Sequence, residues 1–224
     1  MQARFVADAI AGKYPVVTAG QVAAMVDEAA GRCWQAPDPA ALRALARPVG
    51  GVEDDILNQV VCLTFIERFG ADPDLAHAPL AILHRLASAS PAEATKRSTT
   101  AVKDYPGQLP TPLSEIDARF DELQMLVRSL AEAAIGATRT RSRLLAHVFA
   151  AIIRIHYYDD GNGRLARFVV QYLMRRWQGP IIVLPKVRND PEWKSALEQG
   201  VAGNIEPLAR QFAIRLRGQE GGEC

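Results

Sequence analysis

The chain has 224 residues and a formal net charge of +1 at pH 7, and 49% of its residues are hydrophobic while 23% are charged. These values are typical of a globular domain, alone or with a smaller appendage, and the neutral charge gives little support to a direct nucleic-acid partner. No apolar run approaches the roughly 20 residues that span a bilayer, and the first residues lack the pattern of a secretory signal peptide. Three cysteines without paired spacing argue against a disulfide framework. We therefore expect a cytoplasmic protein, with translocation into a host cell left open.

The N-terminal part predicts a series of short helices. Thr18 is suited to cap a helix over 18–32, and shorter helices are expected over 40–46 and 80–88. Between them, residues 54–69 place apolar side chains over a broad face, as in a buried helix. The connections PDPA, PVGG and ADPD read as turns, which suits an α-helical bundle with short connections.

A different composition follows. Residues 89–112 are rich in Ser, Thr, Pro and Gly and show no helical stripe. Two short strands over 99–103 and 108–111, joined by a turn at 104–107, would make a hairpin. A plain surface loop is the alternative.

The remaining chain returns to helical patterns. Long helices are predicted over 113–134, 140–156 and 163–177, each with apolar residues on one face. The run IIVLP resembles a strand or an extended crossover, and residues 190–217 supply two more helices. The sequence therefore predicts a mainly α-helical protein.

The most informative segment runs from His156 to Arg167 and reads HYYDDGNGRLAR. Gly161 and Gly163 permit positive φ and close approach of a ligand, and alternating Gly-Asn-Gly can form a concave anion nest. The following helix begins at this point, so its first N–H groups and its positive dipole end face the same place. These features predict a phosphate site.

Charged side chains at this helix start support that prediction. Arg164 and Arg167 lie within the first turn, where each cation is disfavoured by about 0.3–1 kcal/mol unless an anion sits among them. Asp160 can pair with these arginines or, beside a triphosphate, hold Mg²⁺. His156, four residues earlier, is near enough to act as a general base.

Each of these features also has an ordinary structural explanation. His156 continues the apolar stripe of its helix, as a hydrogen-bonded core histidine does. Asp-Gly-Asn-Gly is most often a turn between helices, and two arginines on one helix commonly form a solvated face. Their joint occurrence in one short segment favours the functional interpretation.

The segment resembles the signature of the Fic family, His-Pro-Phe-x-(Asp/Glu)-Gly-Asn-Gly-Arg-x-x-Arg. The likeness extends over about residues 80–217: AHVFAAIIRIH resembles the helix entering the motif, KRSTTAVKDYPGQLPTP the strand-pair flap, and RNDPEWKSALEQGVAGNIEPLARQFAIRL the closing helices. The resemblance implies an all-α, Fic-type helical bundle with a short β-hairpin flap beside the active site. It divides the chain into N-terminal accessory helices (1–78), a catalytic core (79–218) and a flexible C-terminal tail (219–224).

The same resemblance implies a protein adenylyltransferase that uses ATP and Mg²⁺ and releases pyrophosphate. His156 would deprotonate a Tyr, Thr or Ser hydroxyl of a target protein, and Asp160 would hold Mg²⁺ on the α- and β-phosphates. The phosphates themselves would be held by the nest and the two cations, namely Gly161, Asn162, Gly163, Arg164 and Arg167. In the related Doc branch a Lys replaces the residue at Gly163 and the chemistry becomes phosphorylation, so Gly163 favours nucleotidyl transfer.

The resemblance also gives a role to the flap, and the chain departs from the family signature at two positions. The flap would align the target by adding it as a strand, through Lys103, Asp104, Tyr105, Pro106, Gly107 and Gln108. Tyr157 and Tyr158 replace the usual Pro and Phe; we expect Tyr158 to pack into the core and Tyr157 to lose a rigid φ and place a phenol near the site.

Regulation and alternative functions stay open from the sequence. No segment matches the family's inhibitory helix, (Ser/Thr)-x-x-x-Glu-(Gly/Asn). This implies an unrestrained enzyme, such as a toxin, or inhibition by a separate antitoxin-like chain or by a different device. One alternative is a non-catalytic or UMP- or GMP-specific nucleotide-binding interaction module on the same scaffold. A nucleic-acid binder is the other.

Overall fold

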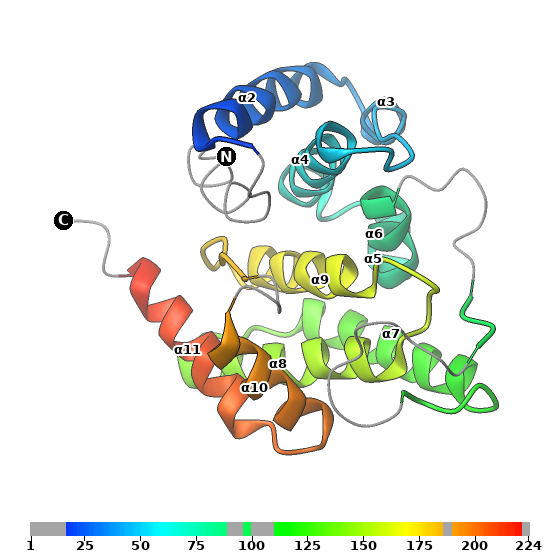
Figure 1. Cartoon of the computed structure of the whole chain (residues 1–224), viewed down its shortest axis with the longest axis vertical. Helices are drawn as coiled ribbons and strands as arrows, with labels where there is room; N and C mark the ends of the chain where they lie inside the picture. The colour runs from blue at the N-terminus through cyan, green and yellow to red at the C-terminus, as the bar shows by residue number, and fades with distance from the viewer. Residues whose placement is uncertain (1–16, 89–95, 100–109, 186–189, 221–224) are drawn as a thin grey trace.

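The computed structural model describes residues 17–88, 96–99, 110–185 and 190–220, which form helices joined by short connections (Figure 1). This confirms the expected all-α fold. The described helices are α2 (Ala19–Gln35), α3 (Pro39–Arg43), α4 (Val52–Phe69), α5 (Pro73–His77), α6 (Pro79–Ser88), α7 (Ile116–Glu132), α8 (Thr138–Ile155), α9 (Asn162–Arg176), α10 (Pro191–Val201) and α11 (Glu206–Glu220).

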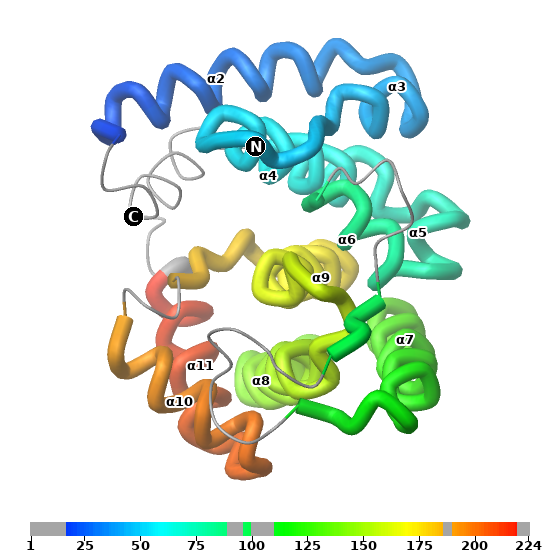
Figure 2. The backbone as a smooth tube through the Cα atoms, turned by 45° about the vertical axis from the view of Figure 1, so that its right-hand side comes forward, coloured from blue at the N-terminus to red at the C-terminus, as the bar shows by residue number. Residues whose placement is uncertain are grey.

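Helix α9 lies at the centre of the molecule. It packs against α8 on one side and against α4 and α6 on the other, and α7 also contacts it. Figures 1 and 2 show α2 and α3 outside α4, and α10 and α11 beside α8 on the opposite side. Apolar residues of α9 such as Leu165, Val169 and Leu173 are fully buried, so the start of this helix is held firmly by its neighbours.

Local sequence explains where several helices begin. The Thr18 side chain accepts from the N–H of Gln21 and the Gln21 side chain accepts from the N–H of Thr18, which confirms the predicted cap as a capping box. Helix α5 was not predicted, because ADPD reads equally well as a turn. Asp72 caps this helix by accepting from the N–H groups of Asp74 and Leu75, and Pro73 occupies its first turn.

The run IIVLP after α9 forms an extended crossover and not a strand. Its backbone pairs with a side chain instead of with another strand: the N–H of Ile182 donates to Oε1 of Gln171, and Nε2 of Gln171 donates back to the carbonyl of Ile182. Gln171 is buried, so these two bonds satisfy its amide.

Some predicted features lie outside the described residues. The flap residues Lys103 to Gln108 fall within 100–109, so the β-hairpin stays a prediction; within the described part, Lys96 forms an isolated antiparallel bridge with Tyr158. Helix α11 ends at Glu220, and the rest of the predicted tail is not described. Among the described helices, none is both long and apolar enough to cross a membrane.

Candidate functional site

The loop between α8 and α9 begins with a strained residue. His156 ends α8 in the left-handed conformation, with φ 48° and ψ 53°, and its N–H donates to the carbonyl of Ile152 at 3.0 Å. An L-residue in this conformation costs about 1–2 kcal/mol, so the surrounding structure must hold it. The strain turns the chain sharply at the residue predicted to be the base.

Arg97 holds this end of α8. Its side chain is only 2% exposed, and its Nε donates to the carbonyl of His156 at 2.9 Å. Its amino groups donate to the carbonyls of Thr99 (2.8 Å) and Thr111 (2.5 Å). A cation at a helix C-terminus is favoured by the dipole. The sequence did not single out Arg97, because nothing in KRSTT distinguishes a buried arginine from a solvated one.

The surroundings of His156 favour its neutral form. Burial lowers the pKa of the His156 imidazole and the charge of Arg97 lowers it further, whereas the Ile153 backbone and the Asp160 carboxylate act in the opposite direction. The net shift is below the ordinary value. The ring is therefore able to accept a proton at neutral pH.

The two tyrosines that follow are both accommodated by packing. Tyr158 is 4% exposed and stacks on His84, with ring centroids 3.6 Å apart, so the expected core position is confirmed. Tyr157 stacks on Phe120 at 3.9 Å, and its hydroxyl donates to Oδ1 of Asp117 at 3.2 Å. The Tyr157 phenol is thus engaged by α7.

The Asn162 side chain bridges the loop by hydrogen bonds to the backbone of Tyr158. The side chain is 2% exposed; its Oδ1 accepts from the N–H of Tyr158 at 3.2 Å and its Nδ2 donates to the carbonyl of Tyr158 at 2.7 Å. Both ends of this buried amide are therefore used within the protein. Only the backbone N–H of Asn162 is left for the predicted phosphate nest.

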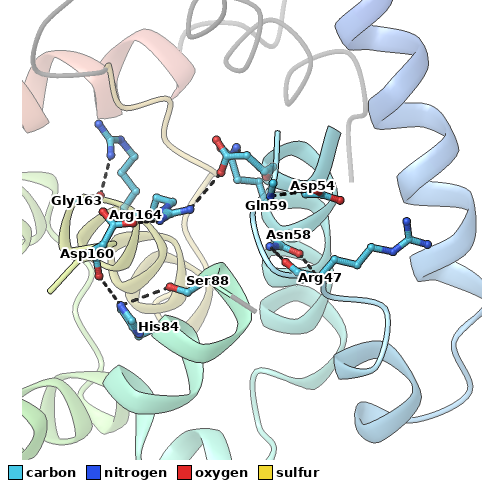
Figure 3. Close-up of polar contacts among 12 residues, drawn as sticks. Arg47, Asp54, Asn58, Gln59, His84, Ser88, Asp160, Gly163 and Arg164 are labelled. Carbon is cyan, nitrogen blue, oxygen red and sulfur yellow. Dashed lines mark hydrogen bonds and ion pairs between the residues drawn. The ribbon is translucent and has the colours of Figure 1, made fainter. Parts of the chain in front are cut away.

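Gly161 must be glycine for two separate reasons. Its φ is +84°, and a Cβ there would lie 2.9 Å from Nε2 of His84 and 3.1 Å from Oγ of Ser88. His84 reaches this loop from α6, where its Nε2 hydrogen-bonds the carbonyl of Asp160 at 2.8 Å (Figure 3). Because burial lowers the pKa of His84, its neutral ring supplies this N–H. His84 was also missed from the sequence.

The start of α9 has the open geometry expected of an anion site. Gly161 is the N-cap and no side chain among the described residues caps the helix. Its own carbonyl accepts from the N–H of Leu165 at 2.8 Å. The earlier N–H groups, those of Asn162, Gly163 and Arg164, precede the first intrahelical bond, so they can donate to a ligand.

Arg164 is flanked by two carboxylates. Its Nη2 donates to Oδ2 of Asp160 at 2.7 Å, which confirms the expected pairing (both residues are labelled in Figure 3). Its Nη1 lies 3.7 Å from Oδ1 of Asp55 in α4. The second partner could not be foreseen, since it lies more than a hundred positions away in the sequence.

Arg167 is a desolvated cation whose hydrogen-bonding capacity is not fully used. Its Nη1 donates to the carbonyl of Gly163 at 2.7 Å and its Nη2 to that of Pro185 at 3.0 Å, whereas its buried Nε has no hydrogen-bond partner among the described residues. Burial lowers the pKa of Arg167 to about 10, a shift that Asp55 opposes and Arg164 increases. The side chain stays charged at neutral pH, and an added anion would relieve it.

One carboxylate in this region suits a metal ion. Among the described residues no three His, Cys, Asp or Glu side chains cluster as metal ligands. The Asp160 side chain is 90% exposed at the loop. Mg²⁺ is commonly held by one or two carboxylates together with phosphate oxygens and water, so this donor set fits Mg²⁺ carried on a nucleotide.

A family comparison covers this region. Residues 80–174 match the model of the Fic/DOC family. This part of the chain belongs to the Fic/DOC family. The Fic segment contains α6 except its first residue, all of α7 and α8, and most of α9, and it includes every signature residue from His156 to Arg167.

Curated relatives of this chain bear an enzymatic name. Protein adenylyltransferase fic-1 from Caenorhabditis elegans is 31% identical over 134 residues, and the protein of that name from Caenorhabditis briggsae is 31% identical over 143 residues. Each match covers 58% of this chain and 25% of the relative. The matched region thus spans about a quarter of the length of these relatives.

Solved structures share the fold over nearly the whole chain. A fragment of Fic-1 from C. elegans superposes with a TM-score of 0.66 at 16% identity, covering 97% of this chain and 60% of that one. A Fic-domain-containing signalling protein from Bacteroides thetaiotaomicron gives a TM-score of 0.62 at 18% identity, covering 96% and 82%. At these identities the likeness concerns the fold.

Proposed function

We propose that this chain is a protein adenylyltransferase, which transfers AMP from ATP to a Tyr, Thr or Ser hydroxyl of a target protein and releases pyrophosphate. One observation carries the proposal: the uncapped start of α9 combines open N–H groups with Arg164 and the desolvated Arg167, one short loop after the neutral His156. An anion belongs at such a helix start. The name of the Caenorhabditis relatives supports AMP as the transferred group.

The reaction follows from the position of these groups. The neutral ring of His156 accepts the proton of the target hydroxyl, whose oxygen attacks the α-phosphorus of ATP. The bond from that phosphorus to the bridging oxygen of the β-phosphate breaks, and pyrophosphate departs with the bonding electrons. Arg164 and Arg167 stabilise the charge that develops on it, while the first N–H groups of α9 hold the phosphates.

Asp160 would hold Mg²⁺ on the incoming nucleotide. When bound, the ion supplies further neutralisation of phosphate charge. The high exposure of Asp160 suits this role, because its carboxylate can leave Arg164 without any change in the buried loop. The partner protein is the target that carries the hydroxyl, aligned by the predicted flap at 103–108.

Labelled nucleotides test the proposal. The purified chain is incubated with lysate and each of the four α-labelled NTPs, beside His156→Ala and the control His147→Ala, which alters an exposed histidine of α8. We expect protein labelling from ATP by the wild type and by His147→Ala, and none by His156→Ala. Labelling from UTP or GTP alone would reject AMP as the group while keeping the mechanism. Nucleotide binding without any transfer would identify a non-catalytic module.

A further inference from the structure

The first turn of α4 lies against the first turn of α9, although α4 precedes the matched Fic segment (Figure 3). Asp55 is the residue of α4 that faces the arginines. Its side chain is 15% exposed, against 90% for the Asp160 side chain. The two carboxylates beside Arg164 therefore differ in freedom: one is enclosed between helices and the other projects into solvent.

Hydrogen bonds to Asn58 and Asp54 fix the place where α4 begins. Asn58 is fully buried; its Oδ1 accepts from the N–H of Arg47 at 2.9 Å and its Nδ2 donates to the carbonyl of Arg47 at 2.6 Å. Asp54 accepts from the N–H of Gly50 at 3.1 Å. These contacts, of which Figure 3 shows that of Arg47 with Asn58, tie the chain entering α4 to the helix itself. They therefore hold the first turn of α4, in which Asp55 lies.

The charge of Asp55 serves both arginines of the site. Its Oδ1 lies 3.7 Å from Nη1 of Arg164, a distance of ionic attraction that exceeds a hydrogen bond. The N–H groups of Nη1 are consequently not consumed by this carboxylate. The Asp55 charge also raises the pKa of Arg167, against the lowering by burial and by Arg164.

We propose that Asp55 is a positioning residue of the nucleotide site, which keeps Arg164 directed at the start of α9 while the exposed Asp160 gives up its contact with Arg164 to a bound polyphosphate. This inference rests on the proposed function. Arg164 exchanges one partner and keeps the other, so its guanidinium is already oriented when the phosphates arrive. Without Asp55 the remaining ionic partner is Asp160, one turn away, which draws the cation toward the loop. The helices before the Fic core thus complete the site.

Nucleotides with different numbers of phosphates test this role. Binding of ATP, ADP and AMP with Mg²⁺ is measured calorimetrically for the wild type, Asp55→Asn and Glu53→Gln. Glu53 is exposed in the same first turn of α4. Glu53→Gln therefore removes one negative charge from the N-terminus of α4, as Asp55→Asn does, and serves as its matched control. We expect Asp55→Asn to weaken ATP and ADP binding several-fold and to leave AMP binding unchanged. Glu53→Gln should resemble the wild type, and Asp55→Glu should restore part of the loss.

A second set of variants separates positioning from general stability. In the Arg164→Ala background, Asp55→Asn should reduce ATP affinity by a smaller factor than it does in the wild type, because only the action of Asp55 on Arg167 remains. An equal loss for ATP, ADP and AMP, or a loss of the same factor with and without Arg164, would overturn the proposal. Tighter ATP binding by Asp55→Asn would also overturn it and make Asp55 a competitor of the phosphates. A wild type that binds no nucleotide rejects this proposal together with the proposed function, whereas normal transfer with an unaffected Asp55→Asn rejects this proposal alone.

Discussion

Replacing Gly161 by alanine tests the architecture of the loop. This glycine has φ +84°, and an added Cβ would lie 2.9 Å from Nε2 of His84, closer than real Cβ contacts. The ring of His84 stacks on Tyr158 and bonds the carbonyl of Asp160, so it cannot move aside without breaking these contacts.

The structure sets the size of the expected effect. Forcing alanine into the left-handed region costs about 1–2 kcal/mol, and losing the hydrogen bond of the buried His84 adds about 1–3 kcal/mol. Gly161→Ala should therefore lower the free energy of unfolding by about 2–5 kcal/mol. Gly203 offers a matched control, since its φ is +104° and nothing lies within 4 Å of its added Cβ. Gly203→Ala should show the conformational cost alone, about 1–2 kcal/mol.

Urea denaturation at 25 °C measures both variants, and ATP binding is measured under native conditions. We expect Gly161→Ala to be the less stable of the two and to bind ATP more weakly, because the loop that begins α9 is displaced. Gly203→Ala should bind ATP as the wild type does. Equal stability of the two variants would refute the inferred crowding by His84.

Three further variants, two at Arg97 and one at Asn162, test the groups that hold the loop. Arg97→Gln removes a positive charge that lowers the pKa of His156, so the acid limb of transfer, where protonation disables the base, should move to higher pH. Arg97→Lys keeps the charge, so it should leave that limb in place while reducing the rate. The pH profile of kcat/KM is measured for both variants. An unmoved acid limb in Arg97→Gln would contradict the inferred effect of the Arg97 charge on the pKa of His156. Asn162→Ala leaves the buried N–H and carbonyl of Tyr158 unpaired and should cost about 2–4 kcal/mol in urea denaturation. A cost under about 1 kcal/mol would show that the clamp is dispensable.

The sequence predicted the helices because their signals are local. Thr18 and Gln21 form a capping box within one turn, and the apolar stripes of α8 and α9 repeat at helical spacing. The same local signal failed at α5, where Asp72 and Pro73 serve as N-cap and first residue although the pair reads as a turn. The sequence could not show whether the extended run after α9 pairs with a strand. In the structure its Ile182 backbone hydrogen-bonds the side chain of Gln171.

In the site, too, features encoded within one segment could be predicted, whereas contacts from distant parts of the chain could not. The glycine-bearing start of α9 and the pairing of Arg164 with Asp160 follow from residues within one segment, so they could be predicted. The groups that hold this segment arrive from distant positions: His84 from α6, Arg97 from the connection before α7, and Asp55 from α4. No periodicity or motif marks them, because their role depends on how the helices pack.

The position of the transferred phosphate tests the central claim most directly. Wild-type chain, His156→Ala and the exposed control His147→Ala are incubated in parallel with lysate and ATP labelled either at the α- or at the γ-phosphate. Kinases of the lysate transfer the γ-phosphate on their own, so each labelling is compared with lysate that lacks the chain. Nucleotidyl transfer predicts that the labelling added by the chain comes from α-labelled ATP alone, and only where His156 is intact. Label that the chain adds from the γ-phosphate above the lysate background, or transfer that survives in His156→Ala, would contradict the account.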